Sequence, residues 1–155
     1  MSAPAPEAGL RVALVVSRYH DVVTRRLQEG ALAALAEAGV AGSAVEVFEV
    51  AGAYELPQAA RAAAETGRFD AVVCLGCVIR GQTPHFEYIA GAAAHGVMQA
   101  ALATRVPIAF GVLTTNSLEE ALARAGAGPA NKGREAAVAA LDLARLFRRL
   151  AGAGG

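Results

Sequence analysis

The middle of the chain reads Leu75-Gly76-Cys77-Val78-Ile79-Arg80-Gly81-Gln82-Thr83-Pro84-His85-Phe86. The start of this stretch continues an apolar run from Ala71, a pattern typical of a strand buried on both faces of a parallel sheet. A turn containing Gly81 follows, and Thr83-Pro84 is suited to open a helix, because proline is favoured in the first helical turn. In an open parallel sheet, ligands bind where the carboxyl ends of strands meet the starts of helices. The stretch therefore predicts both a parallel α/β fold and the place of its binding site.

The residues that follow this strand have the chemistry of an active site. Backbone amides around Gly81–Thr83 at the start of a helix favour an anion such as phosphate, and Arg80 adds a positive charge. His85 can transfer protons near neutral pH. Simpler interpretations stay open, because His85 is equally compatible with a helix cap and Arg80 with a surface ion pair or a structural clamp.

Strand and helix patterns alternate four times along the chain, and one more helix follows at the end. Strands are predicted at Leu10–Val16, at Ala44–Val50, from Ala71 into Cys77–Arg80, and at Pro107–Thr114. Helices are predicted from Val23 to Gly39, from Pro57 to Gly67, over Ile89–Thr104, after Ser117, and over Arg134–Leu150. This alternation predicts a doubly wound α/β domain, in which a four-stranded parallel sheet carries helices on both faces. The strand ends would then meet at one edge, at Ser17–Asp21, Ala51–Glu55, Arg80–His85 and Thr114–Asn116.

The composition fits one domain without an obvious polyanionic partner. Of the 155 residues, 55% are hydrophobic and 18% charged, and the formal net charge is zero. We expect a single domain over residues 10–150, between a flexible segment at 1–9 and a frayed tail at 151–155. Nucleic acid and anionic membrane surfaces are disfavoured as partners, since both require a basic excess. Residues 1–9 lack the pattern of a signal peptide and no stretch is suited to span a bilayer, so a cytoplasmic location is predicted.

The predicted helix over Ile89–Thr104 contains no Asp, Glu, Lys or Arg, and many of its side chains are small. A helix that is apolar on most sides is normally buried on most sides. A single small domain would leave one face of this helix in water, and so apolar a surface is unusual on a monomer. We therefore expect the second face to contact another subunit.

Specific positions argue against several other functions. Gly76–Thr83 nearly matches the P-loop pattern G-x-x-x-x-G-K-[ST], but Gln82 stands at the lysine position, which disfavours a nucleoside triphosphate and leaves a single phosphate. No G-x-G-x-x-G occurs, so a dinucleotide is disfavoured too. A phosphorelay receiver needs an acid at the end of the third strand, and Cys77–Arg80 contains none. Cys74 and Cys77 form a C-x-x-C, but on a strand they point to opposite faces, about 10 Å apart. We interpret both as small core residues rather than as a redox pair or half a zinc site.

Other polar residues have an ordinary structural explanation beside a functional one. Tyr19 follows the first strand, as a plain loop residue would. Ser117 and Glu120 fit a capping box, and Arg124 near the end of the same short helix is favoured there by the helix dipole. Asn131-Lys132-Gly133 fits a turn and the start of the last helix.

Taken together, the chain from Val12 to about Phe147 resembles the 6,7-dimethyl-8-ribityllumazine synthase family. The motifs that carry the resemblance are Gly52-Ala53-Tyr54-Glu55-Leu56-Pro57, Gly76 through Tyr88, Phe110-Gly111-Val112-Leu113-Thr114-Thr115, and Arg124-Ala125-Gly126 with Asn131-Lys132-Gly133. The resemblance implies a flavodoxin-like three-layer sandwich. It also implies a transferase of riboflavin biosynthesis, which condenses 5-amino-6-(D-ribitylamino)uracil with 3,4-dihydroxy-2-butanone 4-phosphate to 6,7-dimethyl-8-ribityllumazine and releases phosphate and water. No cofactor and no metal are implied.

The resemblance further implies a set of site residues. The ribitylaminouracil would contact Tyr19, Ala53, Glu55, Val78 and Ile79, with Tyr19 stacking on the pyrimidine. The phosphate of the second substrate would be held by Gly81, Gln82, Thr83 and Arg124. His85 would transfer protons, and Phe110 and Lys132 match positions that a neighbouring subunit contributes.

Assembly is implied in the same way. Family members form pentamers, some of which pack into a hollow icosahedral capsid, and the short connection Gly126–Gly133 favours the capsid here. A riboflavin synthase is a further partner that the resemblance suggests. The chain departs from the family at Tyr19, which is commonly phenylalanine, at His20, where many relatives carry asparagine, and at Gly128, where a lysine is frequent. Two alternative functions remain: a riboflavin synthase of the archaeal type with the same fold, and a non-catalytic flavin- or lumazine-binding shell protein.

Overall fold

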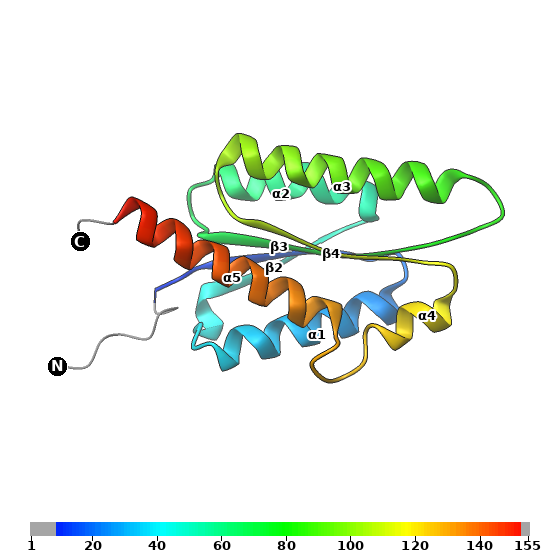
Figure 1. Cartoon of the computed structure of the whole chain (residues 1–155), viewed down its shortest axis with the longest axis horizontal. Helices are drawn as coiled ribbons and strands as arrows, with labels where there is room; N and C mark the ends of the chain where they lie inside the picture. The colour runs from blue at the N-terminus through cyan, green and yellow to red at the C-terminus, as the bar shows by residue number, and fades with distance from the viewer. Residues whose placement is uncertain (1–8, 153–155) are drawn as a thin grey trace.

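A computed structural model describes residues 9–152 of the chain. Four parallel strands form one sheet in the order β2-β1-β3-β4 (Figure 1). Their bounds are β1 Val12–Ser17, β2 Val45–Val50, β3 Ala71–Ile79 and β4 Ile108–Thr115. The predicted four-stranded parallel sheet is confirmed, with each strand shifted by at most two residues.

Helices cover both faces of this sheet (Figure 1). The helices are α1 Asp21–Glu37, α2 Leu56–Glu65, α3 His85–Thr104, α4 Leu118–Ala123 and α5 Lys132–Ala151, and two short 3-10 turns are η1 Gly42–Ala44 and η2 Ala53–Glu55. Helices α1, α4 and α5 lie on one face, and α2 and α3 on the other. The three-layer architecture is therefore the expected flavodoxin-like one. Of the predicted terminal segments, residues 1–8 and 153–155 lie outside the described residues, while Ala151 still belongs to α5.

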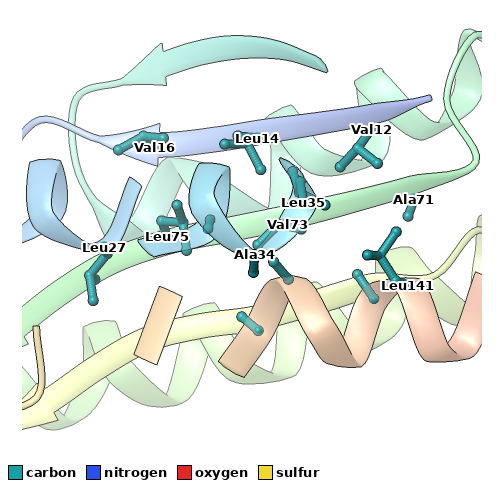
Figure 2. Close-up of a cluster of buried hydrophobic side chains, with 14 of the residues drawn as sticks. Val12, Leu14, Val16, Leu27, Ala34, Leu35, Ala71, Val73, Leu75 and Leu141 are labelled. Carbon is teal, nitrogen blue, oxygen red and sulfur yellow. The ribbon is translucent and has the colours of Figure 1, made fainter. Parts of the chain in front are cut away.

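Alternating side chains of the strands build two separate cores. On β1, Val12, Leu14 and Val16 point toward α1 and α5, where they pack with Leu27, Leu35 and Leu141 (Figure 2). The residues between them, Ala13 and Val15, face α2 and α3. The same alternation puts Cys77 in the first core and Cys74 in the second, and both thiols are free. Their interpretation as small core residues is confirmed, because side chains on opposite faces of a sheet cannot form a disulfide.

Helices α4 and α5 begin at side-chain caps, with one correction to the prediction. Ser117 Oγ accepts a hydrogen bond from the Glu120 N–H at 3.1 Å, as a helix cap should. The Glu120 carboxylate, however, accepts from the Asn116 N–H rather than from Ser117, so only half of the predicted capping box forms. Helix α5 begins two residues before the predicted Arg134, because Asn131 Oδ1 accepts from the Arg134 N–H at 3.0 Å and caps the helix earlier.

Helix α3 buries only one narrow face. Its buried residues are Ala93, Val97 and Ala100, and Val97 belongs to the core between this helix, α2 and the sheet. On the other side Tyr88 and Leu102 are 74% and 72% exposed. The predicted second face is therefore present and uncovered in a single chain, on a helix whose only charged residue is Glu87 in its first turn. Within residues 9–152, no helix is both long and apolar enough to span a membrane.

Candidate active site

A cavity of about 790 Å³ lies at the carboxyl edge of the sheet. The loops after β1, β2 and β3 and the start of α3 form its wall, as expected for the ligand-binding edge of a parallel sheet. It is lined by Tyr19, His20, Gly52, Ala53, Tyr54, Glu55, Cys77, Val78, Ile79, Arg80, Gly81, Thr83, His85, Phe86 and Ile89. We call it the first cavity. Most of the wall is aromatic or aliphatic, which suits a flat organic ring.

The loop after β1 presents one aromatic ring to the first cavity. Backbone hydrogen bonds from Arg18 N to Val50 O (2.8 Å) and from Tyr19 N to Ala51 O (3.0 Å) join this loop to the end of β2. The Tyr19 side chain is 69% exposed, with its ring centroid 4.4 Å from that of His20. His20 adopts a left-handed backbone conformation (φ 62°), which histidine and asparagine tolerate better than most residues. Partial burial lowers the pKa of His20 below its usual value of 6.5, so the uncharged ring is favoured.

The loop after β2 supplies a carboxylate. Glu55 Oε1 accepts a hydrogen bond from the Gly52 N–H at 2.9 Å, which holds the carboxylate at the rim while leaving its second oxygen without a partner in the described residues. Ala53 is buried beneath the loop, and Tyr54 is exposed and lines the cavity. This segment can therefore offer an acceptor to hydroxyl groups of a ligand.

The loop after β3 is held by Arg80. Its backbone N–H donates to Thr115 O at 2.8 Å, and its Nε donates to Asn116 Oδ1 at 3.1 Å, so that it joins the ends of β3 and β4. Its guanidinium also lies 5.2 Å from the ring centroid of Phe86 and 3.7 Å from the Glu87 carboxylate. The structural-clamp interpretation of Arg80 is supported by these contacts. The loop from Arg80 to α3, Gly81–Pro84, is exposed, and His85 follows as the first residue of α3.

A second cavity, of about 410 Å³, lies at the outer edge of the sheet. It is lined by Val112, Leu113, Thr114, Thr115, Arg124, Ala130, Lys132 and Glu135, from the end of β4, the end of α4 and the start of α5. Lys132 Nζ lies 3.3 Å from Glu135 Oε1, and Arg124 Nη1 donates to Glu120 O at 3.0 Å. No residue lines both cavities.

The structure thus brings together most, but not all, of the predicted site residues. The first cavity contains Tyr19, Ala53, Glu55, Val78, Ile79, Gly81, Thr83 and His85. Gln82 lies in the same exposed loop but does not line the cavity. Arg124 and Lys132 line the second cavity, and Phe110 lies on β4 against the α2–α3 core, in neither cavity. The residues that the resemblance implies for phosphate binding are therefore not brought together within one chain.

Sequence reasoning placed His20 and Tyr54 among the strand-end residues of this edge but gave neither a role, and it gave none to Phe86. Tyr54 had a usable signal, since an aromatic residue beside Glu55 at a strand end is placed to face a ligand. Phe86 had none, because it reaches the cavity through the path of the loop that Arg80 holds. Within residues 9–152, no group of three or more His, Cys, Asp or Glu side chains is placed to bind a metal ion.

Comparison with known proteins agrees on one family. The family described as 6,7-dimethyl-8-ribityllumazine synthase matches residues 9–148. A protein of that name from Syntrophus aciditrophicus (strain SB) is 47% identical over 142 residues, covering 92% of each chain. Another of that name, from Chlorobium chlorochromatii (strain CaD3), is 46% identical over 143 residues, again covering 92% of each chain.

Proposed function

The chain belongs to the 6,7-dimethyl-8-ribityllumazine synthase family, and we propose that its two cavities are the two halves of one active site, joined across the contact between neighbouring copies. Membership makes the protein a lumazine synthase, a transferase of riboflavin biosynthesis. Neither alternative, an archaeal-type riboflavin synthase or a non-catalytic binding protein, is favoured by the names of its relatives.

The first cavity has the shape and chemistry to bind the ribitylaminouracil. The exposed ring of Tyr19 is free to stack on a pyrimidine, and Val78 and Ile79 offer an apolar wall for its edge. The ribityl chain is rich in hydroxyl groups, which need acceptors. The Glu55 carboxylate, oriented by the Gly52 N–H, supplies one beside Ala53.

One observation carries the proposal of a shared site: the cations that a phosphate needs are not in the first cavity. Arg80 is the only lysine or arginine among the described residues that line it, and Arg80 is already engaged by Asn116 and Glu87. The exposed amides of Gly81–Thr83 supply donors but little charge. Arg124 and Lys132, which would complete the charge, line the second cavity. A neighbour that presents its second cavity to the first cavity of this chain brings both cations to the phosphate. Phe110, which the resemblance also assigns to a neighbour, lies outside both cavities.

The reaction then depends mainly on holding two substrates together. The amine attacks the ketone to form a Schiff base with loss of one water, and phosphate is then eliminated. The ribityl-bearing nitrogen attacks the remaining carbonyl and closes the ring to the lumazine with loss of a second water. His85, at the first turn of α3 on the cavity wall, accepts and returns the protons. Fixing both reactants in one site can lower the barrier by roughly 7–11 kcal/mol.

Self-association supplies the neighbour in this proposal. The exposed face of α3 with Tyr88, Met98 and Leu102 has no charged residue after Glu87 and is apolar enough to be covered by another copy. A pentamer, its packing into an icosahedral capsid, a cytoplasmic location and a riboflavin synthase partner remain proposals from the resemblance. Sedimentation velocity of the purified chain measures the assembly directly; a monomer that is fully active would contradict the shared site.

The decisive experiment mixes two defective variants in one assembly. His85→Ala and Arg124→Ala chains, each with a different affinity tag, are co-expressed and the mixed oligomers are isolated through both tags. Random mixing gives about one quarter of the sites an intact first half from one chain and an intact second half from the other. At a butanone phosphate concentration well below the KM of Arg124→Ala, activity should therefore rise well above that of either variant. The matched control pairs His85→Ala with Glu55→Ala, two defects in the same half, and should show no recovery. If the first pair recovers no more than the control, each site lies within one chain.

A further inference from the structure

We propose that Asn131 is a positioning residue of the phosphate half-site, which holds Arg124 and Lys132 in place by fastening their loop to helix α1. This inference rests on the proposed role of those two cations. Neither of them is anchored through a buried side chain of its own, because Arg124 is exposed and Lys132 only half-buried. Their positions therefore depend on the backbone between them.

The Asn131 side chain ties three segments together. It is only 3% exposed. Its Nδ2 donates to Arg26 O of α1 at 3.1 Å and to Gly126 O of the loop at 3.0 Å. Its Oδ1 accepts from the Arg134 N–H at the start of α5. Both donors and one acceptor of the amide are thus used, and a buried amide satisfied in this way has a single orientation.

Two glycines on the facing helices make room for this arrangement. A Cβ at Gly30 of α1 would overlap the Asn131 side-chain oxygen, and a Cβ at Gly133 of α5 would overlap the backbone oxygen of Leu27. Since the conformation of neither glycine is left-handed, space alone requires glycine here. Helices α1 and α5 therefore approach closely at the point where Asn131 enters between them.

The hydrogen bonds of Asn131 fix Arg124 and Lys132 through the backbone of their loop. The Lys132 N–H donates to Arg124 O at 3.0 Å, which closes the loop and sets the two residues beside each other. The Asn131 N–H donates to Gly128 O at 3.2 Å within the same loop. Release of the Asn131 side chain from Arg26 O and Gly126 O would free this closed loop from α1, and both cations would lose their fixed position over the second cavity.

Asn131→Asp separates this role from helix capping. The carboxylate keeps an acceptor for the Arg134 N–H, so α5 stays capped, but it presents oxygen instead of N–H to two carbonyl groups. We expect the KM for the butanone phosphate to rise about tenfold to a hundredfold, as displacements near 1 Å do in other sites. The KM for the ribitylaminouracil should not change. The inhibition constant of inorganic phosphate should rise by the same factor.

Two further variants test the inference independently. Gly30→Ala keeps every group of Asn131 but pushes its side chain aside, and should give the same selective rise on a smaller scale even if Asn131→Asp folds poorly. Leu35→Val removes a core methylene on α1 away from both cavities and controls for general loss of stability. A rise of both KM values together, or a rise in Leu35→Val equal to that in Gly30→Ala, would mean that Asn131 is merely structural. If the KM for the butanone phosphate is unchanged in Asn131→Asp but raised in Arg124→Ala, this inference alone is overturned. If that KM is unchanged in Arg124→Ala as well, the proposed phosphate site itself is overturned.

Discussion

The first and second cavities are built from different parts of one sheet, and they differ in chemistry. The first lies over the ends of the central strands β1 and β3, with helix α3 beside it, and its wall is mainly aromatic and aliphatic. The second lies beyond the edge strand β4, and Arg124, Lys132 and Glu135 make it polar and charged. A central strand end is enclosed by elements of its own chain, while an edge strand is open on one side. The contrast teaches that the apolar half suits a ring, and that the charged half at the sheet edge suits an anion and can be reached by a neighbouring copy.

The largest expected effect comes from His85, the proposed proton-transfer residue of the first cavity. His85→Ala should lower kcat about 10²–10⁴-fold, the usual contribution of a general acid–base, and leave both KM values nearly unchanged. Steady-state kinetics measure this, with circular dichroism to confirm the fold. Complete loss of turnover in a folded variant would count against a mainly positional mechanism.

A smaller and more selective effect is expected in the second cavity. Arg124→Ala removes a charge-assisted hydrogen bond worth about 1.5–3 kcal/mol, so the KM for the butanone phosphate should rise roughly tenfold to a hundredfold. The KM for the ribitylaminouracil serves as the internal control and should stay constant. If the two constants change together, the two cavities do not divide the substrates as proposed.

Removing the negative charge of Glu135 in the second cavity should lower the KM for the butanone phosphate. Glu135 holds Lys132 at 3.3 Å in the unliganded chain and would repel a phosphate there. An exposed pair of this kind is worth at most about 1 kcal/mol, so Glu135→Gln should lower the KM for the butanone phosphate by a factor of about five or less. Phosphate inhibition assays at low salt measure the change best. A raised KM would instead show that Glu135 is needed to orient Lys132.

The smallest expected effect is on the pH dependence of folding stability, through His20 of the first cavity. Burial holds the pKa of folded His20 below 6.5, whereas the unfolded chain has the ordinary value, so the unfolded state binds more protons as the pH falls. The stability tied to the neutral ring is therefore present above about pH 6.5 and is lost as pH falls through the folded pKa. His20→Asn keeps a residue that tolerates the left-handed backbone and cannot titrate. Urea unfolding across this range should show less loss of stability in the variant, and equal slopes would remove His20 from the acid response.

Much of the fold followed from patterns that extend over a few residues. The apolar run into Ile79 and the helix signals around Gly39 and Pro57 were sufficient to predict the elements, because hydrophobic periodicity and caps act between near neighbours in the chain. The same local logic placed His85 beside the carboxyl end of β3 and separated Cys74 from Cys77 across the sheet. The predictions from local signals were less accurate where two neighbouring backbone groups competed for one side chain. The Glu120 carboxylate, for example, is bonded to Asn116 rather than to Ser117.

That the predicted site residues lie in two separate cavities could be learned only from the packed molecule. Nothing local distinguishes Arg124 and Lys132 from residues of the first cavity; their separation follows from the strand order β2-β1-β3-β4, which puts β4 and the helices after it at the outer edge. The burial of Asn131 between α1 and α5 likewise depends on Gly30, about a hundred positions away in the chain. Contacts between distant segments are set by how the layers pack, and this packing, rather than any motif, buries a turn residue between two helices and gives it the supporting role proposed above.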